Sequence, residues 1–247
     1  MTEFGDKVYV IVGGTGDIGQ EVCERLYALG ARIVIASRNG DKLTEQRGRF
    51  DGIETVEIDA RQFDEVEGCF NRARERFGRV DGAVNCVGSI FLKAAHRTTQ
   101  EEFCETVAIN LNTAFATVRS AARSMIQEGG SIVLISTAAA QIGLSNHDAI
   151  AAAKAGIEGL TRAAAATYAA RKVRINCVAP GLVETSLSKS VRAHETNRKY
   201  SLSLHPLDRF GQPSDVASAI LFFLDPANSW VTGQCMPVDG GLSSIKG

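Results

Sequence analysis

Short runs rich in valine and isoleucine alternate with longer amphipathic stretches along almost the whole chain, and this alternation restricts the possible folds more than any other feature. The apolar runs, which predict buried strands, are KVYVIV, RIVIAS, ETVEID, VDGAVNC, SIVLIS and VRINCVAP. Stretches such as DIGQEVCERLYALG and DEVEGCFNRARERFG lie between them and have helical periodicity. We therefore predict an α/β fold, a doubly wound parallel sheet with helices on both faces, in one domain over residues 1–247.

Composition narrows the function classes. The 247 residues carry a formal net charge of −1, which gives no electrostatic basis for binding nucleic acid or an anionic membrane. No apolar run approaches the ~20 residues that span a bilayer, and the N-terminal segment has no signal-peptide pattern. The six cysteines are scattered singly, which predicts reduced thiols and no metal site. We expect a cytoplasmic protein with a small-molecule substrate.

The first apolar run ends in VGGTGDIG, where Gly14, Gly16 and Gly19 satisfy the pattern G-x-G-x-x-G. Such a turn brings the backbone close to a pyrophosphate and directs a helix N-terminus at the phosphates. Its position after a strand and before an amphipathic helix favours a dinucleotide site over a simple tight turn. The predicted contacts in this turn are Gly13, Thr15, Gly16, Asp17, Ile18 and Gly19.

The end of the second strand selects the dinucleotide. An acidic residue there would bind the ribose 2′-hydroxyl of NAD(H), but the chain has Ser37 and Arg38. An arginine can bind a 2′-phosphate through charge-assisted hydrogen bonds. We therefore predict that NADP(H) is preferred and that NAD(H) can also bind. The alternative is that Arg38 is only a solvated residue at a strand end.

Several further landmarks, taken in order, resemble the short-chain dehydrogenase/reductase family over nearly the whole chain. Asp59 in EIDA, Asn110 in INLNTAF and the segments RFGQPSDVA and TGQCMPVDGG match family positions, while Val12 stands where threonine is usual. The flanking sequence is also similar to that of 3-oxoacyl-acyl-carrier-protein reductases. The resemblance implies a Rossmann-like, seven-stranded parallel sheet, a nicotinamide cofactor, and a homodimer or homotetramer. The cofactor contacts that it implies are Asp59, Ala60, Asn85, Val87, Gly88, Lys154, Pro180, Gly181, Val183 and Thr185.

The catalytic pattern of that family is where this sequence departs from it. The family has a serine, a tyrosine thirteen residues later and a lysine four residues after the tyrosine. Counting back from Lys154 places Ile150 at the tyrosine position and Thr137 at the serine position. A second Tyr-x-x-x-Lys match, Tyr168 to Lys172, lies at the far end of the helix and is interpreted as packing. The resemblance therefore implies that Asn110, Thr137 and Lys154 remain while the tyrosine acid is absent.

Three hypotheses account for a site without that tyrosine. The enzyme could reduce an activated C=C bond, with the enolate stabilised electrostatically. His147, seven residues before Lys154 and on roughly the same helix face, could be the acid, as in the longer tyrosine-to-lysine spacing of enoyl-acyl-carrier reductases. The alternative for His147 is that it only begins the helix. Thirdly, the chain could be a non-catalytic NADP(H)-binding sensor or oligomer partner. An engineered substitution at Ile150 would leave the same pattern.

A polar, weakly periodic segment over residues 184–208 interrupts the regular alternation. Such insertions in α/β proteins commonly cover a site, so we predict a substrate lid. It carries Lys189, Arg192, Arg198 and Lys199, which would suit an anionic substrate such as a carboxylate or an acyl thioester. The alternative is that these cations form a solvated face.

Overall fold

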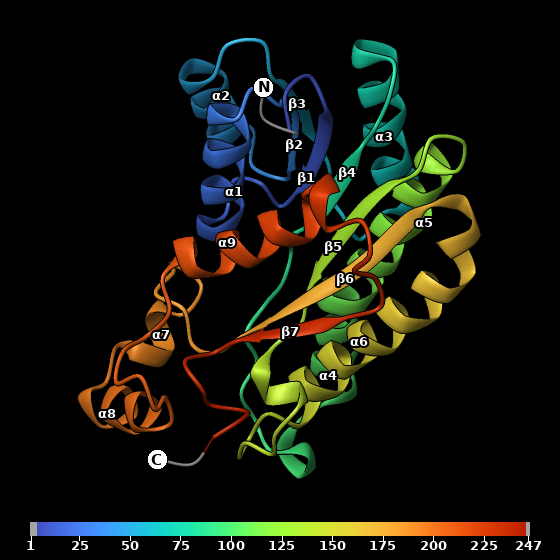
Figure 1. Cartoon of the computed structure of the whole chain (residues 1–247). Coiled ribbons are helices and arrows are strands. Elements are labelled where there is room, and N and C mark those ends of the chain that lie inside the picture. The colour runs from blue at the N-terminus through green and yellow to red at the C-terminus, as the bar shows by residue number, and fades with distance from the viewer. Residues whose placement is uncertain (1–3, 246–247) are drawn as a thin grey trace.

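A seven-stranded sheet forms the centre of the computed structural model, which describes residues 4–245. Its strand order is β3-β2-β1-β4-β5-β6-β7, and every neighbouring pair is parallel (Figure 1). The prediction of a doubly wound parallel sheet is confirmed, including the seventh strand that the family resemblance implied. The strands are β1 Val8–Val12, β2 Arg32–Ser37, β3 Glu54–Glu57, β4 Gly82–Asn85, β5 Gly130–Ile135, β6 Val173–Pro180 and β7 Cys235–Val238.

Helices cover both faces of the sheet (Figure 1). One apolar cluster joins the sheet to α1, α2 and α9, and a second joins its other face to α3, α5 and α6. Because both faces are covered, the strands are apolar at nearly every position rather than at every second one. The helices around the sheet are α1 Asp17–Ala28, α2 Gly40–Arg49, α3 Phe63–Phe77, α4 Gln100–Val107, α5 Thr113–Met125, α6 Asp148–Tyr168 and α9 Pro213–Leu224.

The long helical pattern through residues 101–127 is not one continuous α-helix. A π-helical segment, Ala108–Asn112, separates α4 from α5. Asn110 lies within it and is completely buried. Single π-helical turns inside helices frequently occur at functional sites, and the side-chain pattern alone does not reveal them. The short 3-10 segments are η1 Ala95–Arg97, η3 Ala138–Ala140, η4 Ala169–Arg171 and η5 Pro226–Asn228.

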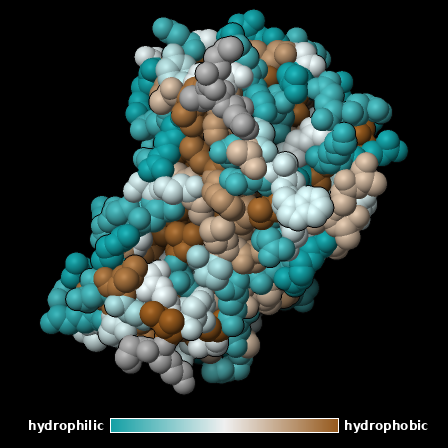
Figure 2. Space-filling view, viewed as in Figure 1, coloured by the Kyte–Doolittle hydropathy of each residue, from teal (hydrophilic) through white to brown (hydrophobic). Residues whose placement is uncertain are grey.

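The segment predicted as a lid, residues 184–208, carries α7 Lys189–Arg192 and α8 Glu195–Ser203. Both helices lie in a lobe beside the carboxyl ends of the central strands (Figure 1). Figure 2 shows hydrophobic surface where this lobe meets the sheet and its helices. Within residues 4–245, no helix is long and apolar enough to cross a membrane. The same described residues contain no group of three or more side chains placed to hold a metal ion.

The glycine-rich turn after β1 is packed too tightly for side chains. Gly13 has φ +79°, and a Cβ atom there would lie 2.9 Å from the backbone nitrogen of Val87. A Cβ atom on Gly19 would lie 2.6 Å from the carbonyl oxygen of Gly13. Because these neighbours are backbone atoms, they cannot move aside as a flexible side chain would. The turn therefore requires glycine for its own packing as well as for the approach of a phosphate.

This packing predicts opposite effects for two Gly→Ala substitutions. We expect Gly19→Ala to lower the free energy of unfolding by ~2 kcal/mol, because the new methyl group overlaps the backbone of the turn. Gly48→Ala, where a Cβ atom on α2 meets nothing within 4 Å, should raise it by ~0.5 kcal/mol through helix propensity. Urea unfolding of both variants measures the difference. An unchanged stability for Gly19→Ala would show that the turn can rearrange.

Candidate active site

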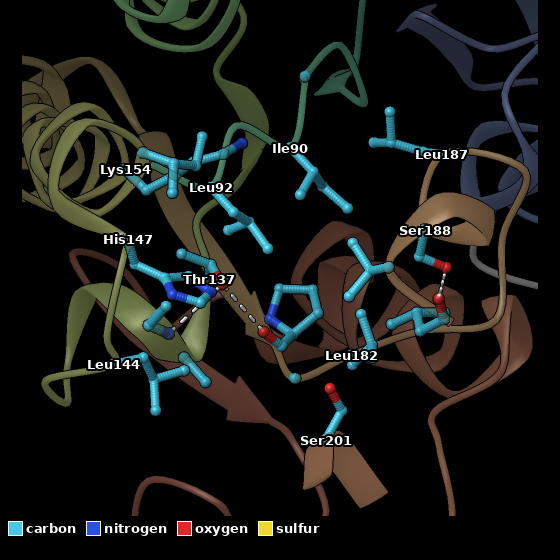
Figure 3. A pocket seen from close by; sticks show the side chains of 18 of the residues that line it. Ile90, Leu92, Thr137, Leu144, His147, Lys154, Leu182, Leu187, Ser188 and Ser201 are labelled. Carbon is cyan, nitrogen blue, oxygen red and sulfur yellow. Dashed lines mark hydrogen bonds between the residues drawn. The ribbon is translucent and has the colours of Figure 1, made fainter. Parts of the chain in front are cut away.

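A cavity of about 500 Å³ opens at the carboxyl ends of the central strands. Doubly wound sheets bind ligands at this edge, beside the strand where the chain order reverses, here β1 between β2 and β4. The cavity walls come from the first turn of α1, the segments after β4, β5 and β6, the start of α6, and the lid (Figure 3). The predicted site residues that line it are Ile18, Val87, Gly88, Thr137, His147, Lys154, Pro180, Gly181, Val183 and Thr185.

The remaining predicted cofactor contacts lie along the strand ends beside this cavity. Thr15 Oγ1 lies 2.6 Å from Ser37 Oγ, so a hydrogen bond joins the glycine-rich turn to the end of β2. Gly16 is the N-cap of α1, and the first helical residue is Asp17. The Asp17 carboxylate accepts hydrogen bonds from Ser186 N at 3.0 Å and Ser186 Oγ at 2.6 Å. The start of α1 is thereby joined directly to the lid.

Arg38 is exposed directly after β2. Within residues 4–245 its guanidinium makes no hydrogen bond or ion pair, although its charge helps to lower the pKa of Asp59. The largest lowering comes from Arg61, which donates to both Asp59 oxygens at 3.0 Å through Nε. Ala60 is buried between these two residues in the sequence. Of the two arginines near Asp59, Arg61 is bound to a carboxylate and Arg38 is not.

The segment after β4 is held by two buried asparagines. Asn85 Oδ1 accepts from Val87 N at 2.8 Å. Asn110, in the π-helical segment, accepts from Ser89 N at 3.1 Å and donates to Ser89 Oγ at 2.9 Å. Gly88 lies between them, and a Cβ atom there would be 3.2 Å from Asn110 Oδ1 and 3.3 Å from Lys154 Nζ. The structure thus brings together three predicted residues, Asn110, Gly88 and Lys154, at one point of the cavity.

Lys154 is a buried cation. Its side chain is only slightly exposed on α6, and Nζ donates to the carbonyl oxygen of Ile135 at 2.8 Å. Burial disfavours the charged form, and this lowers the pKa of Lys154 from 10.5 to about 8. A lysine in this environment keeps its charge at neutral pH but loses it in mildly alkaline solution.

Two neighbouring hydroxyl groups after β5 differ in direction, which the sequence could not determine. Ser136 Oγ donates to Glu158 Oε1 at 3.0 Å and lies 3.2 Å from the carbonyl oxygen of Lys154, so it faces α6. Thr137 Oγ1 makes a long bond of 3.4 Å to the carbonyl oxygen of Pro180 and lies in the cavity wall (Figure 3). Both residues line the cavity, but the Ser136 hydroxyl is already held by Glu158, which leaves Thr137 as the more weakly engaged hydroxyl of the two.

His147 and Ile150 lie side by side with Lys154 on the cavity wall formed by the start of α6. His147 is half-buried, and its Nδ1 is 2.8 Å from the carbonyl oxygen of Ser145. Because a carbonyl oxygen only accepts, this contact places the proton of the neutral ring on Nδ1. The neutral ring can then only accept through Nε2, while the imidazolium can donate from it. Ile150 is buried one turn before Lys154.

His205 is a site residue for which the sequence offered no role. It is buried at the end of the lid, where Nε2 accepts from Leu182 N at 3.1 Å and Nδ1 lies 2.8 Å from the carbonyl oxygen of Ser201. Its ring lines the cavity beside Gly181. The contact with Leu182 joins residues 23 positions apart, so no local sequence pattern could have found it.

The four lid cations do not line the cavity. Arg192 Nη1 is 3.5 Å from Glu184 Oε1, and Lys199 Nζ is 3.5 Å from Glu195 Oε1. Arg198 lies over the Phe210 ring, and Lys189 is exposed on α7. The second Tyr-x-x-x-Lys match is also absent from the lining, because it lies at the far end of α6.

Fold and site together define a doubly wound protein that can hold a dinucleotide at the switch point of its sheet. The glycines of the first turn leave the space that this dinucleotide would occupy, and Cβ atoms would fill that space.

A family model described as enoyl-(acyl carrier protein) reductase matches residues 14–243. The human 3-oxoacyl-[acyl-carrier-protein] reductase is 32% identical over 242 residues, 97% of this chain and 99% of that protein. L-xylulose reductase of Bos taurus is 32% identical over 240 residues, 96% of each chain.

Solved structures agree with these relatives. A short-chain type dehydrogenase/reductase from Mycobacterium ulcerans superposes with a TM-score of 0.94 at 31% identity, covering 100% of this chain and 93% of that one. ElxO with NADP bound superposes with a TM-score of 0.91 at 28% identity, covering 97% and 99%. The chain belongs to the short-chain dehydrogenase/reductase family of oxidoreductases, whose members bind nicotinamide cofactors.

The buried charge of Lys154 predicts a conflict between stability and function. We expect Lys154→Met to stabilise the free protein at pH 7 by ~2 kcal/mol, because a pKa lowered from 10.5 to about 8 corresponds to a burial penalty of ~3 kcal/mol and the bond to Ile135 is lost. Below pH 8 both folded and unfolded lysine are charged, and the folded state bears the full penalty. Between pH 8 and 10.5 the unfolded state binds more protons, so the penalty disappears as pH rises.

Urea unfolding of wild-type and Lys154→Met protein at pH 7 and pH 10 tests this prediction. The stability difference between the two should shrink at pH 10. Lys189→Met, at an exposed lysine on α7, is the matched control and should change the free energy of unfolding by less than ~0.5 kcal/mol. A stability difference that stays constant with pH would contradict the shifted pKa of Lys154.

Proposed function

We propose that this protein is an NADP(H)-dependent reductase with an atypical active site, acting on a carbonyl group or an activated C=C bond of a small molecule. The observation that carries the proposal is Ile150, buried in the cavity wall one turn before Lys154, where members of the family are expected to have tyrosine. The other predicted groups, Asn110, Thr137 and Lys154, lie around the same cavity or its immediate support. The site therefore keeps a means of binding cofactor and substrate but lacks the usual proton donor.

A reduced nicotinamide supplies hydride to an electrophilic carbon when it is bound. The chain must then stabilise or protonate the oxygen that gains negative charge. Thr137 can donate a hydrogen bond to that oxygen. Lys154 supplies a buried positive charge at neutral pH, and His147 can donate a proton from Nε2 in its imidazolium form. These three groups, all in the cavity lining, support reduction without a phenol.

The cavity favours an uncharged, largely apolar substrate. Within residues 4–245 its lining contains no carboxylate and no arginine, and its only lysine is Lys154. Apart from Lys154 and His147, such a wall offers no cationic partner to an anionic group, whose burial would cost several kcal/mol of desolvation. The carboxylate of an anionic substrate, or the phosphate of a phosphopantetheine thioester, would remain outside, at the lid. Apolar residues of the lining include Ile90, Leu92, Leu144, Leu182 and Leu187 (Figure 3). Val191 and Leu204 also belong to it.

The preference for NADP(H) rests on Arg38. Arg38 follows Ser37 at the end of β2. Within residues 4–245 its guanidinium makes no hydrogen bond or ion pair, so its donors are available to a phosphate. We expect Arg38→Ala to weaken NADPH binding by about 10- to 100-fold, since a charge-assisted hydrogen bond to phosphate contributes ~1.5–3 kcal/mol. NADH binding should change by less than about threefold. The matched control is Arg32→Ala, at the opposite end of the same strand, where Arg32 pairs with Asp6 at 3.2 Å.

Nucleotide fluorescence titrations of wild type and both variants measure these affinities. Equal losses for NADPH and NADH in Arg38→Ala would mean that Arg38 does not read the 2′-phosphate. Failure of the wild type to bind either nucleotide would overturn the cofactor assignment itself.

The role of His147 separates the two proposed reactions. For ketones, we expect His147→Ala to lower kcat by ~10²–10⁴-fold, because it removes the proton donor. The neutral ring keeps its proton on Nδ1, so only the imidazolium form can donate to the ketone oxygen from Nε2. For enones, the rate of His147→Ala should stay within about threefold of the wild type, because carbon is protonated by water and the oxygen needs only electrostatic stabilisation.

NADPH consumption with matched ketones and enones, each with and without a carboxylate, measures this difference. Ser145→Ala is the control, because it alters the same loop yet keeps the carbonyl group that contacts His147. Turnover of enones alone would mean conjugate reduction without an acid. Tight NADPH binding with no turnover on either panel would favour the alternative of a non-catalytic NADP(H)-binding protein.

A further inference from the structure

His205 joins the lid to the strand segment that forms the cofactor side of the cavity. It is 4% exposed and follows α8 by two residues. One ring nitrogen contacts the carbonyl oxygen of Ser201 on α8 at 2.8 Å, and the other contacts the backbone nitrogen of Leu182 at 3.1 Å. Leu182 directly follows Pro180 and Gly181 at the end of β6. The imidazole ring therefore bridges two segments that the chain itself connects only through the whole lid.

These two partners determine the protonation state of the ring. The Ser201 carbonyl oxygen can only accept a hydrogen bond, and the Leu182 amide can only donate one. His205 must therefore be neutral, with its proton on Nδ1 and a free electron pair on Nε2 facing Leu182. An added proton on Nε2 would replace an attractive N–H···N contact with two hydrogens facing each other, so the bond to Leu182 could not survive.

The packing around the ring allows no easy substitute for this contact. A Cβ atom on Gly181 would lie 2.7 Å from His205 Nε2, so the ring can approach only because residue 181 is glycine. The Phe210 ring meets His205 edge-on, with centroids 6.0 Å apart. His205 and Gly181 also line a second cavity of about 300 Å³ on the other side of the segment. The ring thus forms part of the wall between two cavities.

Charged groups near the ring are engaged elsewhere. Asp239, at the end of β7, accepts from Gly241 N at 2.9 Å and Ser243 N at 2.8 Å. Arg209, four residues after His205, pairs with Asp215 at 2.6 Å. Asp239, Arg209 and Asp215 are the charged residues that share the second cavity with His205, and the titratable residues His147, Lys154, Tyr200 and Cys86 share the first. Within residues 4–245, none of them makes an ion pair or hydrogen bond with the ring that would hold it in a protonated form.

We propose that His205 is a positioning residue, which in its neutral form holds the segment Gly181–Thr185 against the cofactor. The effect on catalysis rests on the proposed function, whereas the contact between His205 and Leu182 is independent of it. Val183 and Thr185 lie in the cavity lining just beyond Leu182, so losing the Leu182 bond displaces the groups predicted to contact the nicotinamide and pyrophosphate. A proton added to Nε2 of His205 breaks the bond to Leu182 and therefore weakens cofactor binding.

Two near-isosteric variants separate the two ring contacts. His205→Gln places a carbonyl oxygen near the position of Nε2 and can still accept from Leu182. His205→Asn places its amide near Nδ1 and can still donate to Ser201, but leaves the buried Leu182 amide without an acceptor. We expect His205→Asn to raise the KM for NADPH by at least about tenfold, as for a buried donor left unsatisfied. His205→Gln should stay within about threefold of the wild type.

The pH profile provides a readout that a purely structural role would not alter. For the wild type, kcat/KM for NADPH should fall at acidic pH as His205 gains a proton, and this acidic fall should be absent in His205→Gln. Equal effects of the two variants on KM, or an acidic fall that persists in His205→Gln, would overturn the proposal. Thermal unfolding of each variant verifies that the folded protein is being compared.

Hydrogen exchange tests the contact without any turnover, so a failed search for substrate does not affect it. The Leu182 amide should be protected in the wild type at neutral pH and lose protection at acidic pH, relative to His205→Gln measured at the same pH. His205→Asn should lack this protection at both pH values. Unchanged protection of the Leu182 amide in His205→Asn would show that His205 does not hold the segment.

Discussion

The close approach of two backbone turns, after β1 and after β4, is the constraint on which the site depends. The turns touch at Gly13 and Val87, where even a methyl group would lie 2.9 Å from a backbone nitrogen. One residue further along, Gly88 lets Asn110 and Lys154 approach the same backbone. A side chain at Gly13 would push the two backbone turns apart, and one at Gly88 would crowd the side chains of Asn110 and Lys154. The parallel order of β1 and β4 makes this meeting possible, and the glycines make it close enough to hold a dinucleotide.

Close to these two turns, one buried charge, the ammonium group of Lys154, lowers the stability of the folded protein. Lys154 is taken out of water, and its main compensation in the free protein is the carbonyl oxygen of Ile135. In the usual arrangement of the family such a lysine would also act on a neighbouring tyrosine. If Ile150 takes the place of that tyrosine, as we propose, the roles left to the ammonium group are to bind the cofactor and to stabilise negative charge. Retention of so costly a group favours a working cofactor site over a decayed one.

The parts of this protein that local patterns encode could be predicted from sequence, and the parts that depend on long-range contacts could not. The apolar runs located the strands, because a sheet covered on both faces needs apolar residues throughout. Spacing along α6 placed His147, Ile150 and Lys154 on one wall, because helical geometry is fixed. The helical side-chain pattern over residues 101–127 did not indicate the π-helical segment around Asn110.

Side-chain direction was the second limit. The direction of the Ser136 hydroxyl depends on Glu158, more than twenty residues away, which holds this hydroxyl against α6. The lid cations look available in the sequence, yet Arg192 pairs with Glu184 and lies outside the cavity lining. The sequence around His205 predicts only a loop, and its contact with Leu182 exists only in the folded chain. In each case the deciding partner comes from a distant part of the chain.

Two histidines with opposite proton requirements now face the same cavity. If ketone reduction uses His147 as the acid, that ring must be charged while His205 remains neutral. Ketone reduction by this route therefore requires one charged and one neutral histidine in the same cavity. In the reverse direction, alcohol oxidation needs a base, so both rings must be neutral. Lys154 keeps its charge until it begins to lose its proton near pH 8. The two directions therefore require different protonation states of His147, whereas His205 must stay neutral in both.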